Sequence, residues 1–258
     1  MPSIHPTALI SESAEIADDV EIGAYTIIED NTKLGPGCKI DSHAKICRGV
    51  IFGPDNKVGH GAVIGGDPQD LGFMTSTDSG VVIGEGNTFR EYVTISRSTR
   101  EGECTRIGHH NFLMAVSHLG HDGEIGDHNV IANNVMMAGH TKIGNRTFLG
   151  GGAAIHQFIH IGDFAMVQGN AGMTRDVPPY CIVHQINQLS GLNVIGLRRG
   201  GFTSEERSEI KKVYQLLLAS KTSRSDALAE VEKHTWSQAA ERLIEAVRHP
   251  SSKGILTR

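Results

Sequence analysis

The sequence predicts an all-β parallel β-helix over residues 1–189, followed by a small α-helical domain over residues 190–258. Three observations predict it. An apolar residue recurs every six positions from Ile4 to Met173, glycine often follows that residue directly, and the last part of the chain changes to helical spacing. Repeats of this kind determine a whole architecture, because each repeat packs only against its neighbours.

The six-residue repeat fills most of the chain, and we call its apolar positions the guide residues. A period of six fits neither an α-helix nor a long strand, and it is typical of short strands joined by tight turns. The series slips by one position across 65–82, and apart from Glu101 every position is apolar, although only 39% of the chain is hydrophobic. The guide residues are Ile4, Ile10, Ile16, Ile22, Ile28, Leu34, Ile40, Ile46, Phe52, Val58, Ile64, Ile83, Phe89, Ile95, Ile107, Leu113, Leu119, Ile125, Ile131, Met137, Ile143, Leu149, Ile155, Ile161, Val167 and Met173.

The six-residue repeat accounts for many of the glycines. The chain contains 31 glycines among 258 residues, and many follow a guide residue, as in Ile22-Gly23 and Ile107-Gly108. Glycine accepts the positive φ and the close backbone approach that we expect at the corners of a coil. The composition that first suggests disorder therefore indicates a regular structure.

Composition and charge exclude several classes of protein. No apolar run approaches the roughly 18 residues of a membrane span, and the net charge of −5 gives no indication of nucleic-acid binding. The four cysteines form no CxxC pair, which suits a reducing compartment. We therefore expect a cytoplasmic protein with no membrane span and no nucleic-acid partner. These cysteines are Cys38, Cys47, Cys104 and Cys181.

Two segments interrupt the repeat and one region follows it. Loops are expected at 65–82 and 97–106, and loops on a rigid scaffold tend to carry function. After the repeat, Thr203-Ser204-Glu205-Glu206 has the pattern of a helix capping box. Apolar residues then follow at helical spacing to Leu218, and 225–233 and 236–248 are also amphipathic.

Several histidines share one phase of the repeat. The pattern resembles that of hexapeptide-repeat proteins, in which three hexapeptides form one coil of a left-handed triangular prism. Residues 18 apart then stack, so that His121 lies below Gly139 and Asp122 lies below His140. One strip across three coils is expected to hold His118, His121, Asp122, His140, His156 and Gln157.

The strip suggests proton-transfer chemistry. A histidine beside a carboxylate is a sound general base, because the acid fixes the tautomer and stabilises the imidazolium. No serine or cysteine pairs evidently with His121, which favours direct transfer over a covalent intermediate. Two alternatives stay open at this point: three histidines that hold Zn²⁺, as in a γ-carbonic-anhydrase-like hydratase, or a prism with no catalytic role.

The residues as a whole resemble a specific family, the acyl-[acyl-carrier-protein]:UDP-N-acetylglucosamine O-acyltransferases that open lipid A biosynthesis. The resemblance covers essentially the whole chain. It is carried by Gln69-Asp70-Leu71, Arg90-Glu91-Tyr92-Val93-Thr94-Ile95, His118-Leu119-Gly120-His121-Asp122, Ala138-Gly139-His140, His156-Gln157-Phe158, Val177-Pro178-Pro179-Tyr180, Gly191-Leu192-Asn193 and Gly201-Phe202.

The resemblance implies a reaction and its catalytic residues. His121 is the general base on the 3-hydroxyl of the glucosamine unit, Asp122 orients it, and the Gly139 backbone N–H is the oxyanion donor. The hydroxyl attacks the phosphopantetheine thioester of a 3-hydroxyacyl chain on acyl carrier protein. No metal and no cofactor beyond this co-substrate is implied.

The resemblance also implies binding residues and an assembly. Gly169 corresponds to the position that measures acyl-chain length. The family forms homotrimers with the active site in the cleft between neighbouring prisms. The residues that match positions in contact with sugar nucleotide or acyl chain are Gln69, Asp70, His118, His140, His156, Gln157, Asn193 and Arg199.

The chain departs from the family pattern at Gly72, Ser96, Ile195 and Gly200. These positions concern the donor and nucleotide contacts and not the base. The acceptor therefore stays open between a 3-hydroxyl and a 3-amino sugar nucleotide, and a related hexapeptide sugar N-acyltransferase is a further alternative.

A group of cations opens the helical domain. Acyl carrier protein is acidic, so a basic surface would steer it despite the overall negative charge; an ordinary solvated helix face explains the two lysines equally well. The cations are Arg198, Arg199, Arg207, Lys211 and Lys212.

Overall fold

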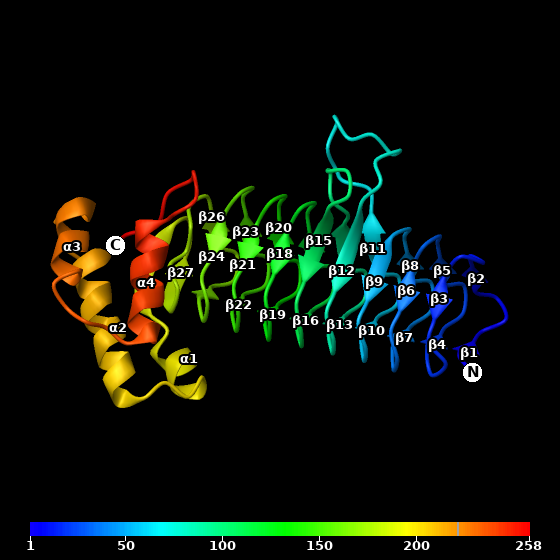
Figure 1. Ribbon diagram of the computed structural model, residues 1–258, viewed down its shortest axis with the longest axis horizontal. Helices are drawn as coiled ribbons and strands as arrows, with labels where there is room; N and C mark the ends of the chain where they lie inside the picture. Colours follow the sequence, from blue (N-terminus) through cyan, green and yellow to red (C-terminus); the bar gives the residue numbers. More distant parts are fainter. Residues whose placement is uncertain (221) are drawn as a thin grey trace.

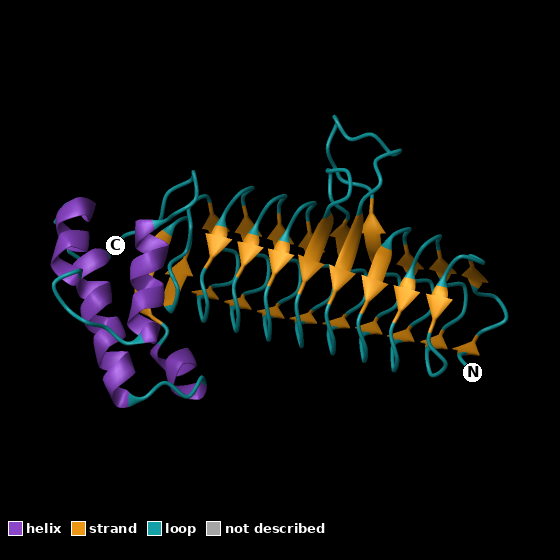
Figure 2. Ribbon diagram, in the orientation of Figure 1, coloured by secondary structure: helices purple, strands orange, loops and turns teal. Residues whose placement is uncertain are grey.

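A computed structural model describes residues 1–220 and 222–258. The described residues form a left-handed parallel β-helix with three flat faces, and the four α-helices among them lie together at its C-terminal end (Figure 1). Figure 2 shows how the strands of successive coils line up as three sheets along the prism. We call the sheets A, B and C, in the order in which the first coil visits them; they contain 11, 9 and 8 strands.

The strands are short, as the repeat predicts. Sheet A contains β1 (Ser3–Ile4), β4 (Glu21–Ile22), β7 (Lys39–Ile40), β10 (Lys57–Val58), β13 (Thr88–Phe89), β16 (Phe112–Leu113), β19 (Val130–Ile131), β22 (Phe148–Leu149), β25 (Met166–Val167), β27 (Cys181–His184) and β28 (Gln188–Leu192). Sheet B contains β2 (Leu9–Ile10), β5 (Ile27–Ile28), β8 (Lys45–Ile46), β11 (Val63–Gly66), β14 (Thr94–Ser96), β17 (His118–Leu119), β20 (Met136–Met137), β23 (Ala154–Ile155) and β26 (Gly172–Met173). Sheet C contains β3 (Glu15–Ile16), β6 (Lys33–Leu34), β9 (Val50–Phe52), β12 (Gly80–Ile83), β15 (Cys104–Ile107), β18 (Glu124–Ile125), β21 (Lys142–Ile143) and β24 (His160–Ile161).

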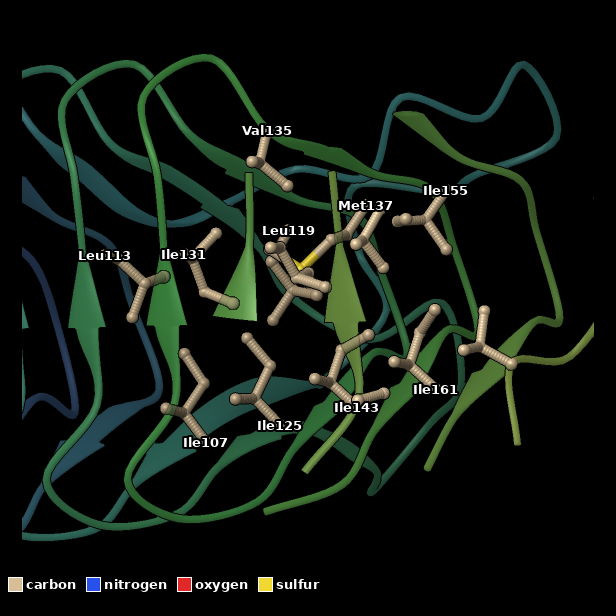
Figure 3. Packing of buried hydrophobic residues seen from close by; sticks show 14 of the residues in the cluster. Ile107, Leu113, Leu119, Ile125, Ile131, Val135, Met137, Ile143, Ile155 and Ile161 are labelled. Carbon is tan, nitrogen blue, oxygen red and sulfur yellow. The ribbon is translucent and has the colours of Figure 1, made fainter. Parts of the chain in front are cut away.

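The guide residues form the core of the prism. From Ile22 to Met173 each of them is at most 3% exposed. Figure 3 shows them pointing inward from all three sheets, with Leu119, Met137 and Ile155 stacked along the axis. Ile4 is 41% exposed, because only the second coil packs against it. The two-residue strands from β4 onward each bury one side chain, as the repeat predicts, whereas the longer strands β9, β12 and β15 bury at least two.

The glycines after guide residues have a narrower role than the sequence suggests. A Cβ at Gly120 would lie 2.6 Å from the Gly139 nitrogen, and one at Gly23 would lie 2.6 Å from the Ser42 nitrogen. Positive φ falls two residues further on, mostly on other residue types, such as Asp122 at 57° and His140 at 60°. Close approach of the next coil, and not positive φ, therefore explains most of these glycines.

One corner of the prism carries a ladder of buried amides, two residues before guide residues of sheet A. The Oδ1 atom of each asparagine accepts hydrogen bonds from both the backbone N–H and the side chain of the next member, at 2.8–3.0 Å. The members are Asn56, Asn87, Asn111, Asn129 and Thr147. Because the side-chain and backbone donors of successive members have partners, the ladder buries polar groups and aligns the coils without leaving a buried polar group unsatisfied.

Two loops interrupt the coils. Residues 67–79 join β11 to β12, and residues 97–103 join β14 to β15. Both project from the same side of the prism and lie next to each other (Figure 1). The Gly102 N–H donates to the Asp78 carbonyl at 2.8 Å, and the Asp78 N–H donates to Glu101 Oε2 at 2.8 Å. The two predicted insertions thus form one loop pair.

The prism ends in an antiparallel hairpin of β27 and β28, so β-structure continues through the expected boundary at residue 189. Four helices follow within residues 190–220 and 222–258: α1 (Val194–Arg199), α2 (Ser204–Leu217), α3 (Arg224–Val231) and α4 (Gln238–Arg248). Thr203 and Glu206 form the predicted capping box at the start of α2. None of the helices in the described part of the chain is long and apolar enough to cross a membrane.

Candidate active site

The turn after β17, which joins sheet B to sheet C and which we call the B–C corner, carries a histidine–aspartate pair. His121 Nδ1 lies 2.8 Å from Asp122 Oδ2, and the two side chains are 10% and 9% exposed. An ionised carboxylate only accepts hydrogen bonds, so Nδ1 carries the proton and Nε2 is the basic nitrogen. This is the arrangement that a general base requires.

Asp122 is held by donors from the second loop. Ser98 Oγ donates to Oδ1 at 2.5 Å, and Thr99 Oγ1 donates to Oδ2 at 2.7 Å. Burial alone would raise the pKa of the Asp122 carboxyl, but the hydrogen bonds from Ser98, His121 and Thr99 outweigh it and lower the pKa to about 2. Asp122 is therefore a fixed anion at neutral pH.

The His121 ring lies against Gly139 in the next coil. A Cβ at residue 139 would be 2.6 Å from His121 Nε2 and 2.6 Å from Cε1, so only glycine fits there. The stacking follows from the strand register, in which Leu119 pairs with Met137. Among the hydrogen bonds of the described residues, none has the buried Gly139 N–H as its donor. This N–H is available to an oxyanion next to the base.

A groove of about 710 Å³ runs over the outer face of sheet B beside the base. His121 and Gly139 line it together with several residues that the sequence singles out: Gln69, His118, His156 and Gln157. Its floor is largely small or apolar, with Ala138, Ala154 and Gly172 in successive coils. The groove therefore combines a base, a backbone donor and an apolar channel.

His118 and His140 flank the base from different sides. His118 lines the groove, and its Nδ1 lies 2.8 Å from Thr94 Oγ1. Burial lowers the pKa of His118, and the neighbouring His121 adds to the effect, whereas the Thr94 contact opposes it. His118 is thus kept neutral near pH 7.

His140 lies on the other side of the B–C corner. It lines a second hollow with Asp122, and its ring stacks on Phe158 with the ring centres 4.5 Å apart. Burial lowers the pKa of His140, while the charge of Asp122, whose Oδ2 lies 3.8 Å from Nε2, opposes the shift. The predicted strip of histidines exists. The B–C corner divides it, so that His118, His121 and His156 line the groove and His140 lines the second hollow.

Six predicted site residues do not line the groove as the described residues define it: Asp122 and His140, which line the second hollow, and the four residues Asp70, Asn193, Arg199 and Gly169. Asp70 is exposed in the first loop. Asn193 caps α1, where its Oδ1 accepts from the Gly196 N–H at 2.9 Å and its Nδ2 donates to the Phe164 carbonyl at 2.9 Å. Arg199 is exposed at the end of α1, and Gly169 is exposed in the turn that joins sheets A and B.

The zinc alternative can be compared with the contacts at the base. His121, Asp122 and His140 each offer one ligand atom, and these atoms lie within 4.8 Å of one another. However, Asp122 Oδ2 already accepts hydrogen bonds from His121 Nδ1 and Thr99 Oγ1. A cation bound at Oδ2 would compete with both of these hydrogen bonds. Among the described residues, the group close enough to share a metal ion is two histidines and an aspartate, and not the three histidines of the zinc alternative.

Sequence reasoning missed the residues that support the pair. Ser98 and Thr99 hold Asp122, and Thr94 holds His118. The one signal for Ser98 and Thr99 was the polar stretch Ser98–Thr105 inside an otherwise apolar repeat, and Thr94 lies outside it. A buried carboxylate needs donors, and this stretch was the nearest source.

A left-handed β-helix that presents a histidine–aspartate pair beside a free backbone N–H is the architecture of a hexapeptide-repeat acyltransferase. Residues 176–256 match the family model described as Udp N-acetylglucosamine O-acyltransferase, Domain 2. With the relatives described next, this match shows that the chain belongs to the acyl-[acyl-carrier-protein]–UDP-N-acetylglucosamine O-acyltransferase family.

Relatives of the same name cover nearly the whole chain. The enzyme of Syntrophobacter fumaroxidans is 39% identical, over 98% of this chain and 99% of its own, and that of Campylobacter concisus is 34% identical over the same shares. The solved UDP-N-acetylglucosamine acyltransferase of Bacteroides fragilis superposes with a TM-score of 0.93, at 36% identity, and covers 98% of this chain and 99% of its own. These matches do not favour the hydratase or a non-catalytic prism.

Proposed function

We propose that this protein transfers a 3-hydroxyacyl chain from acyl carrier protein to the 3-hydroxyl of UDP-N-acetylglucosamine, the first step of lipid A biosynthesis. The observation that carries the proposal is the position of His121 Nε2, which is free of the Asp122 contact and lies against Gly139 in the groove. Relatives that cover 98% of the chain carry the name of this activity.

The geometry supports a single direct transfer. His121 Nε2 takes the proton of the acceptor hydroxyl as its oxygen attacks the thioester carbonyl carbon. The carbonyl oxygen becomes an anion and accepts a hydrogen bond from the Gly139 N–H. The C–S bond then breaks, and His121 returns its proton to the departing thiolate of the phosphopantetheine arm. Asp122, ionised at neutral pH, stabilises the imidazolium between these steps.

The acyl chain and the sugar occupy different parts of the groove. We assign the sugar to the end lined by Gln69 and His118, with Asp70 nearby in the first loop, and the acyl chain to the floor beyond His156 and Gln157. His140 supports the site from the other side of the corner, through Asp122. Each of these assignments is part of the proposal.

The remaining binding residues require a second protomer in this proposal. Asn193, Arg199 and Gly169 lie outside the groove of their own chain, and a homotrimer would bring another chain's residues to it. Sheet B and its edge with sheet A also expose large apolar side chains, which is typical of an interface between subunits. They include Leu9 at 66%, Tyr25 at 58%, Tyr92 at 55%, Val116 at 53% and Met136 at 54% exposed.

Acyl carrier protein would dock on the helical domain. A groove of about 640 Å³ there is lined by Arg207, Lys211 and Arg258, and Arg198, Arg199 and Lys212 are exposed nearby in the sequence. Such a surface attracts an acidic partner. We place the protein in the cytoplasm, a reducing compartment in which its four free cysteines stay reduced.

One assay tests the proposal. Purified protein is incubated with UDP-N-acetylglucosamine or its 3-amino analogue and with 3-hydroxyacyl carrier proteins of different chain lengths, alongside His121→Ala. We expect ester formation by the wild type and a loss of kcat of about 10²–10⁴ in the variant. Transfer to the amino analogue alone would correct the acceptor, and a fully active His121→Ala would remove the base assignment.

A further inference from the structure

Arg97 is an arginine with almost no exposed surface, at 2%, directly after β14. Its guanidinium binds the first loop at three points. Nε donates to Asp67 Oδ1 at 2.9 Å, Nη1 to the Thr77 carbonyl at 2.5 Å, and Nη2 to the Thr75 carbonyl at 3.0 Å. Burying a charge is costly unless it is paired and hydrogen-bonded, so these contacts fix the loop to Arg97.

The same guanidinium also packs against the middle of the loop. Its central carbon lies 4.9 Å from the ring centre of Phe73, within the range of a cation–π contact. Gln69, the loop residue that lines the groove, lies between Asp67 and Phe73 in the sequence. Arg97 therefore holds the loop on both sides of Gln69.

A path toward the catalytic pair also begins at Nη1 and passes through Ser79, the last residue of the first loop. Nη1 contacts Ser79 Oγ at 3.2 Å, and this hydroxyl donates to the Ser98 carbonyl at 2.6 Å. Ser98 Oγ in turn donates to Asp122 Oδ1 at 2.5 Å. Ser79 and Ser98 are buried, at 7% and 0% exposed. These hydrogen bonds, together with the covalent frame of Ser98, thus join the first loop and Arg97 to Asp122.

We propose that Arg97 is a positioning residue that holds the loop carrying Gln69 and the carboxylate of Asp122 in one arrangement, so that the sugar and the base are set relative to each other. Arg97 acts through these residues and is not placed at the reacting atoms. The inference rests on the proposed function, because that function assigns Gln69 to the sugar and Asp122 to the base.

Arg48 supplies a matched control. Its Nη2 donates to the same two carbonyls, Thr75 at 2.9 Å and Thr77 at 2.7 Å. Among the described residues it has no hydrogen bond to Ser79 or Ser98. Arg48→Lys therefore loosens the loop alone, Ser79→Ala breaks the connection to Ser98 alone, and Arg97→Lys disturbs both. Lysine keeps the charge but cannot reproduce the planar set of donors.

Steady-state kinetics separate the two effects. For Arg97→Lys we expect KM for UDP-N-acetylglucosamine to rise and kcat to fall, each about tenfold, as loss of charged hydrogen bonds predicts. Arg48→Lys should raise KM about threefold with kcat unchanged, and Ser79→Ala should lower kcat about fivefold with KM unchanged. If Arg97→Lys lowers only the melting temperature, Arg97 has a purely structural role and the proposal is wrong.

Hydrogen exchange on the free protein keeps this test independent of the activity. We expect Arg97→Lys to speed amide exchange both in 67–79 and at Ser98–Thr99, whereas Arg48→Lys should affect only 67–79. Absence of acyl transfer by the wild type would reject the proposed function but leave this comparison valid. If Arg97→Lys does not fold, Ser79→Ala decides: unchanged kcat and unchanged exchange at Ser98–Thr99 would overturn the inference.

Discussion

The imidazole of His121 lies so close to Gly139 that no side chain fits between them. A Cβ on residue 139 would be 2.6 Å from Nε2. The two residues occupy the same position in successive coils, since Leu119 pairs with Met137. The base and the proposed oxyanion donor are therefore placed by one stacking contact of the β-helix.

Replacing Gly139 with alanine should displace His121 with little effect on folding. The backbone at 139 is not in the positive-φ region, so alanine costs nothing there in conformation, but its methyl group collides with the ring. A shift of about 1 Å at a base can cost on the order of 100-fold. We expect kcat for acyl transfer to fall by about that factor, measured beside the melting temperature.

Gly66→Ala is the control for this change. Its added methyl meets only Val63 Cγ1, at 3.5 Å, which is an ordinary contact. The control should keep wild-type kcat. Full activity in Gly139→Ala would show that the ring does not need to rest on residue 139.

Asp122→Asn should change how stability depends on pH. The folded pKa of Asp122, about 2, lies below the unfolded value near 3.9. The resulting stabilisation of about 3 kcal/mol is complete above about pH 5 and is lost progressively as the pH falls through the folded pKa. Urea unfolding of both proteins from pH 6 to 2.5 should therefore show the wild type's advantage shrinking below about pH 5. A constant difference over that range would contradict the assignment.

Gly169→Met should shift the acyl preference to shorter chains. Gly169 is exposed at the edge that sheet B shares with sheet A, where an added side chain would begin 3.2 Å from the Gly151 carbonyl and fill nearby space. Competition between carrier proteins with long and short 3-hydroxyacyl chains measures the effect as a ratio. An unchanged ratio removes the assignment of Gly169, and an equal loss for all chains would indicate general damage.

Leu119→Ala should destabilise the prism at the level of the active site. Leu119 is fully buried and stacks on Met137 in the core (Figure 3). Removing a buried leucine side chain costs about 3 kcal/mol in the free energy of unfolding. Ile51→Ala, at a position 39% exposed, should cost about 1 kcal/mol or less. Equal losses in the free energy of unfolding, measured with urea, would show that a guide residue contributes no more to stability than a half-exposed residue.

Much of the prism could be predicted because its period is short and regular. The apolar residue every sixth position identifies the core, and a constant coil length places Gly139 on His121 and His140 on Asp122. The capping box also locates the start of α2 at Thr203. These features depend on local chemistry or on fixed spacing, both of which the sequence displays.

The support of the base could not be predicted, because loops change the spacing. Ser98 reaches Asp122 although 24 positions separate them, and the same separation joins Thr94 to His118. A constant coil length does not find such pairs. The burial of Arg97 could not be predicted either. Arg97 is buried against backbone carbonyls of the first loop, and the conformation of that loop does not follow the six-residue repeat.

The end of the prism also differed from expectation for a physical reason. The β27–β28 hairpin and the short helix α1 lie where the period stops, so no pattern identified them. Asn193 was expected as a binding residue, yet its side chain caps α1 in this chain. Both of its hydrogen-bonding groups are satisfied there.

The amide ladder from Asn56 to Thr147 fixes where each coil stacks on the one before it, regardless of how many residues the coil contains. Asn56 and Asn87 are neighbours in the ladder although 31 positions separate them, and the next rungs are 24 and then 18 positions apart. Whatever the length of the loop in a coil, the coil returns to the same corner, where its ladder residue hydrogen-bonds to the ladder residue of the preceding coil. Loops of this β-helix can therefore grow or shrink while the coil that carries His121 keeps its place.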